Sequence, residues 1–247
     1  SAMKNLRTFF SGLPLGKNMP LFVAGLFLAA CGDDSSGPYL TMDESSSSIQ
    51  SSGSVASSSS VRLQPCRTET EDNCEYGTIT DERDGKTYKT VKIGNWIWMA
   101  ENLNYDAGEG CYCYDDKEEN CEKYGRLYTF DVANTVCPKD FYLASSYQYR
   151  ILFDQVGADS SAVALKSDHG WEEDGNGLDQ FGFSALPGGS RYYEGSYLSE
   201  GEVAKFMTCD KDIMGEVTVG LAYNQVKGNM QGGYAGRAAY VRCYRLP

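Results

Sequence analysis

The cysteines are the residues of this chain with the most reactive side chains. Nine occur among 247 residues: Cys31 near the N-terminus and eight between positions 66 and 243. A structural zinc site needs closely spaced ligand pairs such as C-x2-C, and these spacings do not supply two of them. An even number of cysteines in an exported chain instead predicts disulfides. Cys113 and Cys121 flank a short acidic loop, so we expect a local bond between them.

A second group of candidate ligands is the acidic, glycine-rich segment 172–179. Asp174, Asn176 and Asp179 offer the oxygen atoms that Ca²⁺ prefers. The segment is not an EF-hand loop, because Leu178 stands where such a loop needs a ligand. The alternative is a solvated acidic turn, which we favour. Ca²⁺ is the one cofactor that the sequence suggests.

Tyrosines in the last third of the chain are candidates for ligand binding. Tyr192, Tyr193, Tyr197 and Tyr234 lie on expected loops or strand ends. Exposed aromatic rings can stack on sugars or on a partner protein at small entropic cost. The alternative is that they fill a core poor in Leu and Ile. We expect most of them to be structural and one or two to be exposed.

Charge and composition exclude several classes of protein. The net charge is −12 and no basic stripe is visible, so nucleic acid is not an expected partner. A single histidine, His169, excludes sites with several histidine ligands. Two carboxylates could form a glycosidase site, but sequence spacing does not show their separation across a cleft. We therefore expect no catalytic site.

The N-terminus is typical of a bacterial lipoprotein. After an expression scar at Ser1-Ala2 come basic residues and an apolar stretch, 21–30, too short to span a membrane. Leu28-Ala29-Ala30-Cys31 resembles a lipobox, in which the cysteine is diacylated. The alternative is an ordinary secretory cleavage site. We expect a signal peptide over 1–31 and lipidation at Cys31. The lipid at Cys31 would then attach the protein to the outer membrane of the cell envelope, and it is the only membrane contact that we expect.

The rest of the chain divides into a tether and one domain. Residues 32–65 are rich in serine and poor in apolar side chains, which predicts a disordered tether. Residues 66–247 have the size of a single domain. Their pattern predicts an α+β fold. We expect helices over 129–136 and from Ser145 or Ser146 to Val156, and strands over 78–80, 88–93, 96–99, 183–186, 217–223 and 239–244.

Several separate segments of this domain resemble one known family. They are D-G-K-T-Y-K-T-V-K-I-G (84–94), W-M-A-E-N-L-N (98–104), Y-G-R-L-Y-T (124–129), L-K-S (165–167), G-W (170–171), D-Q-F-G-F-S-A-L-P-G-G (179–189) and V-R-C (241–243). In this order and spacing they resemble the Fibrobacter succinogenes major paralogous domain, over residues 77–245. That family occurs on exported proteins and lipoproteins of fibre-degrading and related bacteria, and no biochemical activity is established for it.

The resemblance also implies a fold. The family looks like a member of the C-type-lectin-like superfamily, which includes the formylglycine-generating enzymes, with short twisted antiparallel strands, two helices and long loops. That fold bridges the end of a helix to the final strand, and Cys137 and Cys243 occupy those places. Cys66–Cys74 and Cys111–Cys209 are then the leftover pairs. The usual W-H-L-P segment is replaced by F-Y-L-A at 141–144, and the usual W-S-S strand is replaced around 207–209.

We therefore expect a lipid-anchored envelope module for adhesion or carbohydrate binding, which recognises glycan or protein through its loops. One alternative is a structural envelope protein with no small ligand. A less favoured alternative is an enzyme, either a glycosidase or one of the formylglycine-generating type. The second chemistry needs a reactive thiol pair, and thiols held in disulfides cannot supply it.

Overall fold

The computed structural model describes residues 62–233 and 235–247; Cys31, the signal peptide and most of the tether lie outside this part of the chain. The described residues form a mixed α+β domain made mostly of strands. Leu63 already donates a backbone hydrogen bond to the carbonyl of Gln155 at 2.7 Å and packs against the core. Ordered packing therefore begins at least three positions before Cys66. Within the described ranges no helix is long and apolar enough to cross a membrane.

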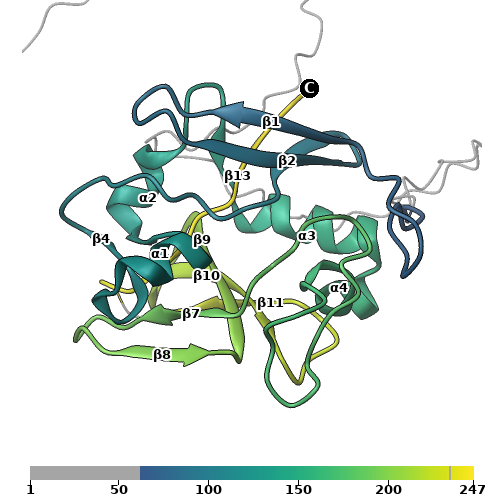
Figure 1. Cartoon of the computed structure of the whole chain (residues 1–247). Helices are drawn as coiled ribbons and strands as arrows, with labels where there is room; N and C mark the ends of the chain where they lie inside the picture. The colour runs from purple at the N-terminus through teal and green to yellow at the C-terminus, as the bar shows by residue number, and fades with distance from the viewer. Residues whose placement is uncertain (1–61, 234) are drawn as a thin grey trace, which may run out of the picture. The chain divides into compact units, whose positions relative to one another are not determined.

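The first sheet contains the predicted meander. β1 (Tyr76–Thr80), β2 (Thr87–Ile93) and β3 (Trp96–Met99) follow one another and pair antiparallel. β13 (Cys243–Arg245) and β6 (Tyr142–Leu143) complete the order β1-β2-β3-β13-β6. The end of the chain thus lies beside its first strands (Figure 1).

The second sheet has eight strands and carries the hairpins of the last third of the chain. Its order is β11-β10-β9-β7-β12-β5-β4, with β8 paired to β7. In Figure 1 the β7–β8 hairpin lies at the end of the domain opposite β1 and β2. The strands are β4 (Cys111–Tyr112), β5 (Leu127–Thr129), β7 (Gly188–Arg191), β8 (Tyr197–Glu200), β9 (Val203–Asp212), β10 (Gly215–Ala222), β11 (Asn229–Gly232) and β12 (Ala238–Tyr240).

The described residues contain four α-helices, of which the sequence predicted two. These two are α2 (Phe130–Val136) and α3 (Ser146–Val156). A capping box between Ser145 and Gln148 starts α3, because it satisfies amides that the first turn leaves unpaired. The buried face of α3 packs on the first sheet through Trp98, whose ring centroid lies 5.3 Å from that of Tyr149. The helices not predicted are α1 (Glu118–Tyr124) and α4 (Ser161–Leu165).

A fully buried arginine connects the segments at the centre of the domain. Arg242 donates to Oδ1 of Asn102 and to the carbonyls of Met99, Phe183 and Ser184, at 2.5 to 3.1 Å. Burial lowers the pKa of Arg242 to about 10, so the guanidinium stays charged at neutral pH. Its hydrogen bonds satisfy four acceptors inside the core.

Two strand predictions are wrong in detail. Residues 183–186 form only an isolated bridge between Ala185 and Lys166, because the carbonyls of Phe183 and Ser184 accept from Arg242 instead of from a neighbouring strand. The predicted strand 239–244 is divided into β12 and β13, and the carbonyl of Val241 between them accepts from the amide of residue 103 at 3.0 Å. The interruption positions Arg242 for its buried contacts.

Three disulfides connect the described residues, and they coincide with three of the expected pairs. Two close local loops of eight positions, and the third joins the end of α2 to β13 across 106 positions. In the chain-entropy model, closing a loop of about 100 residues stabilises the fold by roughly 4–5 kcal/mol. The bonds are Cys66–Cys74, Cys113–Cys121 and Cys137–Cys243.

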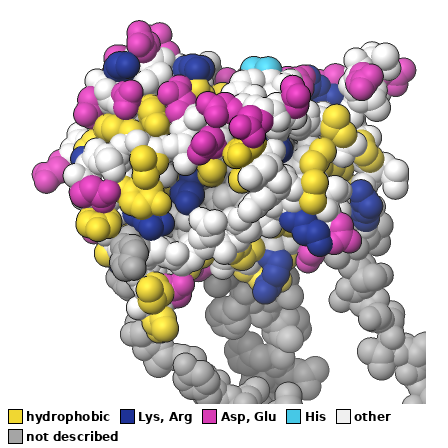
Figure 2. Space-filling model, turned by 90° about the horizontal axis from the view of Figure 1, so that it is seen from below, with side chains coloured by type: hydrophobic (Ala, Val, Ile, Leu, Met, Phe, Trp, Pro, Cys, Tyr) yellow, Lys and Arg dark blue, Asp and Glu magenta, His cyan; other side chains and the backbone are white. Residues whose placement is uncertain are grey.

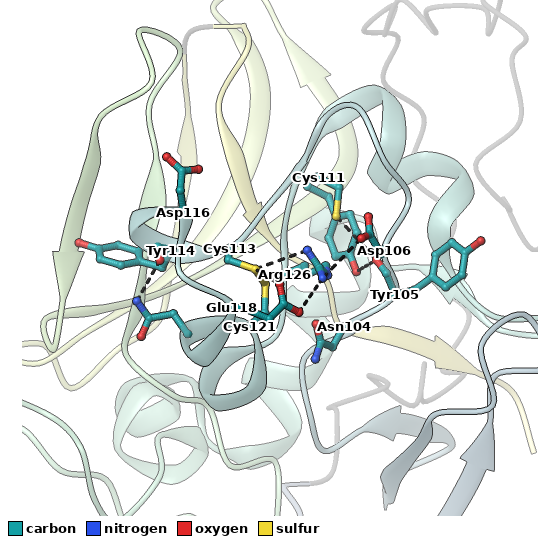
Figure 3. Close-up of a disulfide and its surroundings, with 12 residues drawn as sticks. Asn104, Tyr105, Asp106, Cys111, Cys113, Tyr114, Asp116, Glu118, Cys121 and Arg126 are labelled. Carbon is teal, nitrogen blue, oxygen red and sulfur yellow. Dashed lines mark hydrogen bonds and ion pairs between the residues drawn. A yellow bond between two sulfur atoms is a disulfide. The ribbon is translucent and has the colours of Figure 1, made fainter.

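The fourth expected bond, between Cys111 and Cys209, is not formed, because Cys111 carries a free thiol. Its Sγ donates to the carbonyl of Tyr105 at 3.7 Å. Burial raises the pKa of the Cys111 thiol, so the group is protonated at neutral pH. In Figure 3 the side chain of Arg126 extends between Cys111 and the neighbouring disulfide, and its Nη1 lies 3.4 Å from the sulfur of Cys113.

Candidate functional site

Three of the tyrosines singled out in the sequence, Tyr192, Tyr193 and Tyr197, lie on the β7–β8 hairpin. The turn at residues 192–196 is closed by backbone hydrogen bonds from Tyr192 to Ser196 at 2.8 Å and from Gly195 to Tyr192 at 3.0 Å. Gly195 has φ +98°, a conformation that glycine adopts without steric cost. The side chain of Tyr193 is 61% exposed at this turn. The hairpin therefore presents one aromatic side chain to solvent on an ordered turn.

One basic side chain, Arg237, lies beside the turn, and a second, Lys205 of β9, is within range of its charge. The guanidinium carbon of Arg237 lies 4.5 Å from the centre of the Tyr192 ring. Lys205 of β9 donates to the side-chain oxygen of Gln231 at 3.0 Å. A methyl group at Gly236 would lie 3.3 Å from Cβ of Tyr193, so Tyr193 adjoins the residue before Arg237. We refer to Tyr192, Tyr193, Lys205, Gln231 and Arg237 as the hairpin surface.

Tyr197 is held more firmly than the tyrosines of the turn. Its hydroxyl donates to Asp116 at 2.6 Å, and its ring lies 5.2 Å from that of Tyr114. The guanidinium of Arg191 lies 3.9 Å from the centre of the Tyr112 ring and 5.8 Å from that of Tyr197. Such cation–π contacts fix the side chains and keep their orientation before any ligand arrives.

The structure thus brings three of the four predicted tyrosines together. Tyr193 is exposed, Tyr192 and Tyr197 are half-buried, and Tyr234 lies outside the described residues. Sequence reasoning did not single out Arg191, Lys205 or Arg237, because these cations are far apart in the chain. Figure 2 shows the molecule from below the view of Figure 1, where charged side chains lie among several small hydrophobic groups.

The acidic loop holds an internal cation. The ammonium group of Lys166 is buried and donates to the carbonyls of Gly175, Ala222 and Tyr223 at 2.7, 3.2 and 3.1 Å. It also lies 4.9 Å from the centre of the Trp171 ring. Burial lowers the pKa of Lys166. The ammonium of Lys166 therefore ties one loop carbonyl, that of Gly175, to two carbonyls at the end of β10.

The three expected calcium ligands have separate environments. Asp179 is buried, forms an ion pair with Arg67 and accepts hydrogen bonds from the amide and hydroxyl of Ser184. Burial raises the pKa of the Asp179 carboxyl group. Oδ1 of Asn176 accepts from the amide of residue 171 at 3.1 Å, and Asp174 is exposed. The side-chain oxygens of Asp179 and Asn176 are thus used to hold the loop together.

Two other groups with metal-binding or acid–base chemistry have structural partners. Ligand atoms of Cys113, Glu118 and Cys121 lie within 4.8 Å of one another, but the two sulfurs are joined and cannot act as thiolate ligands. His169 has an exposed side chain, and its Nδ1 lies 2.7 Å from a carboxylate oxygen of Asp168. Its exposure places it on the surface, away from the packed core.

A polar cleft of about 420 Å³ opens between the start of β2 and α1. Its charged lining residues are Lys86, Glu101, Glu122 and Lys123, so cations and carboxylates are mixed there. Of the site residues expected from the sequence, only Cys121 of the local disulfide lines it, and none of the expected ligand-binding or calcium-binding residues does. Residues of the segments W-M-A-E-N-L-N and Y-G-R-L-Y-T line it. These two segments of the family resemblance are therefore the feature of the sequence that points to this cleft.

Comparison with known families assigns the domain. Residues 91–245 match the model of the Fibrobacter succinogenes major domain, which is more than half of the chain. The chain belongs to this family. No curated protein and no solved structure matches it. The matched range of the Fibrobacter succinogenes major domain includes the hairpin surface, the Lys166 loop and the Cys137–Cys243 bond.

Proposed function

We propose that this protein is a lipid-anchored binding module of the cell envelope, which recognises glycan or protein through the hairpin surface. The observation that carries the proposal is the 61% exposed Tyr193 on an ordered turn next to Arg237, whose charge reaches Lys205. Tyrosine and arginine are enriched where proteins bind partners, because they provide large contact areas and directed hydrogen bonds. The role is non-catalytic.

We also propose that the module has a C-type-lectin-like fold. Supporting it are two mainly antiparallel sheets and the bond from the end of α2 to the last strand. The resemblance of the family to that superfamily gives the same expectation. The α1 and α4 helices are additions to the two that the resemblance implies.

Attachment to the outer membrane through Cys31 is the second part of the proposal. The lipobox L-A-A-C follows a short apolar stretch, and two or three acyl chains hold a protein stably on a bilayer. Cys31→Ser in the native host is expected to abolish fatty-acid labelling and to release the protein from the membrane fraction. Unchanged labelling of the variant would remove this part of the proposal.

A glycan array with and without Ca²⁺ tests the binding function. The proposal predicts saturable glycan binding that Tyr193→Ser abolishes and Ca²⁺ does not alter. Tyr147→Ser is the matched control, because Tyr147 is 54% exposed on α3. No glycan binding by the wild type, together with measurable binding to other envelope proteins, would favour a structural role.

A further inference from the structure

We infer that the hairpin surface binds an acidic saccharide, with a sugar carboxylate held by Lys205 and Arg237 and a sugar ring stacked on Tyr193. The inference rests on the proposed function and specifies its ligand. A uronic acid carries a pyranose ring and a carboxylate in the same residue, which are the two groups that this surface complements.

The first argument is the environment of Lys205. Its ammonium donates to the neutral amide oxygen of Gln231, and within the described residues it forms no ion pair with a carboxylate. Burial and, after it, the positive charge of Arg237 lower the pKa of Lys205. Lys205 therefore lies within electrostatic range of a second cation, Arg237, and pairs with no carboxylate of the described residues. An anion bound there gains charge-assisted hydrogen bonds and relieves their repulsion.

The second argument is how the strands fix the two cations. Lys205 lies in the middle of the paired part of β9, and β10 separates it from Gln231 on β11. Arg237 immediately precedes β12 and stacks on Tyr192, which follows β7. Both cations are thus attached to the central strands of the second sheet. A surface ordered in this way loses little conformational entropy on binding.

The third argument is the position of the exposed ring. Cβ of Tyr193 lies close to Gly236, which immediately precedes Arg237 in the chain. The side chain of Tyr193 is therefore attached near the backbone of Arg237. The exposed carboxylate of Glu194 is hydrogen-bonded to Ser196, and the buried Glu216 accepts from the amide of Gly236 at 3.2 Å. Aromatic faces bind sugar rings by stacking, whereas a free inorganic anion would not use Tyr193.

The chain as a whole does not favour anions. Its net charge of −12 repels them at long range, so attraction must come from this local pair of cations. The inference therefore predicts binding that is specific in position and weakened by salt, because added salt screens the exposed part of the interaction.

Calorimetric titration of the full chain tests the inference with four probes: an α-1,4-linked galacturonate hexamer, a glucose hexamer of the same linkage, a glutamate hexapeptide and inorganic phosphate. We expect the galacturonate hexamer to bind most tightly. Lys205→Met should weaken this binding by about tenfold, the size expected for losing a hydrogen bond to a charged group. Lys205→Arg should restore most of it.

Two controls make the result specific. Lys92→Met removes the same charge from β2, where Lys92 pairs with exposed Glu75 at 3.2 Å, and should leave binding unchanged. Tyr193→Ser should weaken galacturonate binding and leave the melting temperature of the protein unchanged. If Lys205→Met lowers the melting temperature, galacturonate binding by Lys205→Gln and Tyr193→Ser is used to test the inference instead.

The failure of the inference is distinct from the failure of the proposed function. If the glucose and galacturonate hexamers bind equally tightly, and Lys205→Met does not affect this binding, the claim that the ligand is acidic is contradicted. Glycan recognition would still hold. If the glutamate hexapeptide or phosphate binds as tightly as the galacturonate hexamer, or more tightly, the claim that the ligand is a saccharide is contradicted. No saccharide binding by the titration or the array would overturn the inference together with glycan recognition.

Discussion

Arg242 donates from Nε to Oδ1 of Asn102 at 2.5 Å, although 140 positions separate the two residues. Nδ2 of Asn102 in turn donates to the carbonyl of Tyr124 at 2.7 Å. Arg242 also binds the carbonyls of Phe183 and Ser184. Three of the segments that carry the family resemblance therefore meet at one buried guanidinium, and Asn102 connects a fourth, Y-G-R-L-Y-T, to it. In this chain those segments build the core, while the hairpin surface is formed by other residues.

Replacing this arginine should be strongly destabilising. Arg242→Met leaves Oδ1 of Asn102 and three buried carbonyls without their donor, which we expect to lower the free energy of unfolding by about 3 kcal/mol or more. Urea unfolding of the purified variant measures the loss. Arg150→Met, an exposed change on α3, should stay within about 0.5 kcal/mol of the wild type. Similar losses in both variants would contradict the central role of Arg242.

The elements that the sequence predicted are those with a clear local pattern. The residue pattern predicted strands over 78–80, 88–93 and 96–99, which correspond to β1 to β3, and Gly85 and Gly94 have positive φ in the turns between them. The apolar period from Tyr149 to Val156 predicted α3. By contrast α1 is only seven residues long and begins with two glutamates, so it has no apolar period to read. The remaining elements depend on contacts between residues that are far apart in the sequence.

The same distinction holds for the candidate site. Tyr192, Tyr193 and Tyr197 are close in sequence, so their proximity to one hairpin was predictable. Lys205 and Arg237 join them only through the order of strands in the second sheet, which no local pattern encodes. The Cys66–Cys74 and Cys111–Cys209 bonds were both assigned by elimination, and only the first is formed, so elimination alone does not determine the pairing.

Calcium should leave the stability of the protein unchanged. The ammonium of Lys166 already binds the loop carbonyl of Gly175 and two carbonyls at the end of β10, and Asp179 is paired with Arg67. We expect equal melting temperatures in Ca²⁺ and in chelator. Asp179→Ala should lower the melting temperature in both conditions, and the exposed Asp174→Ala should lower it in neither. A rise with Ca²⁺ that disappears in the two variants combined would restore the calcium site.

Acid should destabilise the protein through Asp81. Burial raises the pKa of this carboxyl, but hydrogen bonds from the side chain and amide of Arg83 outweigh burial and lower it. A lowered pKa stabilises the fold above the unfolded value of about 3.9, and that stability is lost as the pH falls through the folded value. Asp81→Asn should therefore reduce stability at pH 7 and reduce it less at pH 2. Urea unfolding across this range measures the difference, and a constant difference would contradict the ion pair.

The long disulfide should contribute more stability than the local ones. Replacing Cys137 and Cys243 by alanine opens a loop of 106 positions, against eight for Cys66 and Cys74. The loss should reach roughly 4–5 kcal/mol at most, because strain and residual structure reduce the entropic figure. Peptide mapping of unfolded, unreduced protein should recover Cys111 alkylated. Recovery of alkylated Cys137 and Cys243 would contradict this framework.

Hydrogen–deuterium exchange of the full chain, with and without an oligosaccharide retained on the glycan array, tests the central claim most directly. Binding through the hairpin surface predicts slower exchange in peptides that cover the β7–β8 turn and the start of β12, since a bound ligand suppresses local opening there. Peptides from α3 and from the cleft beside β2 should exchange at unchanged rates. Protection confined to the cleft or to the first sheet, with none at the turn around Tyr193, would contradict the account.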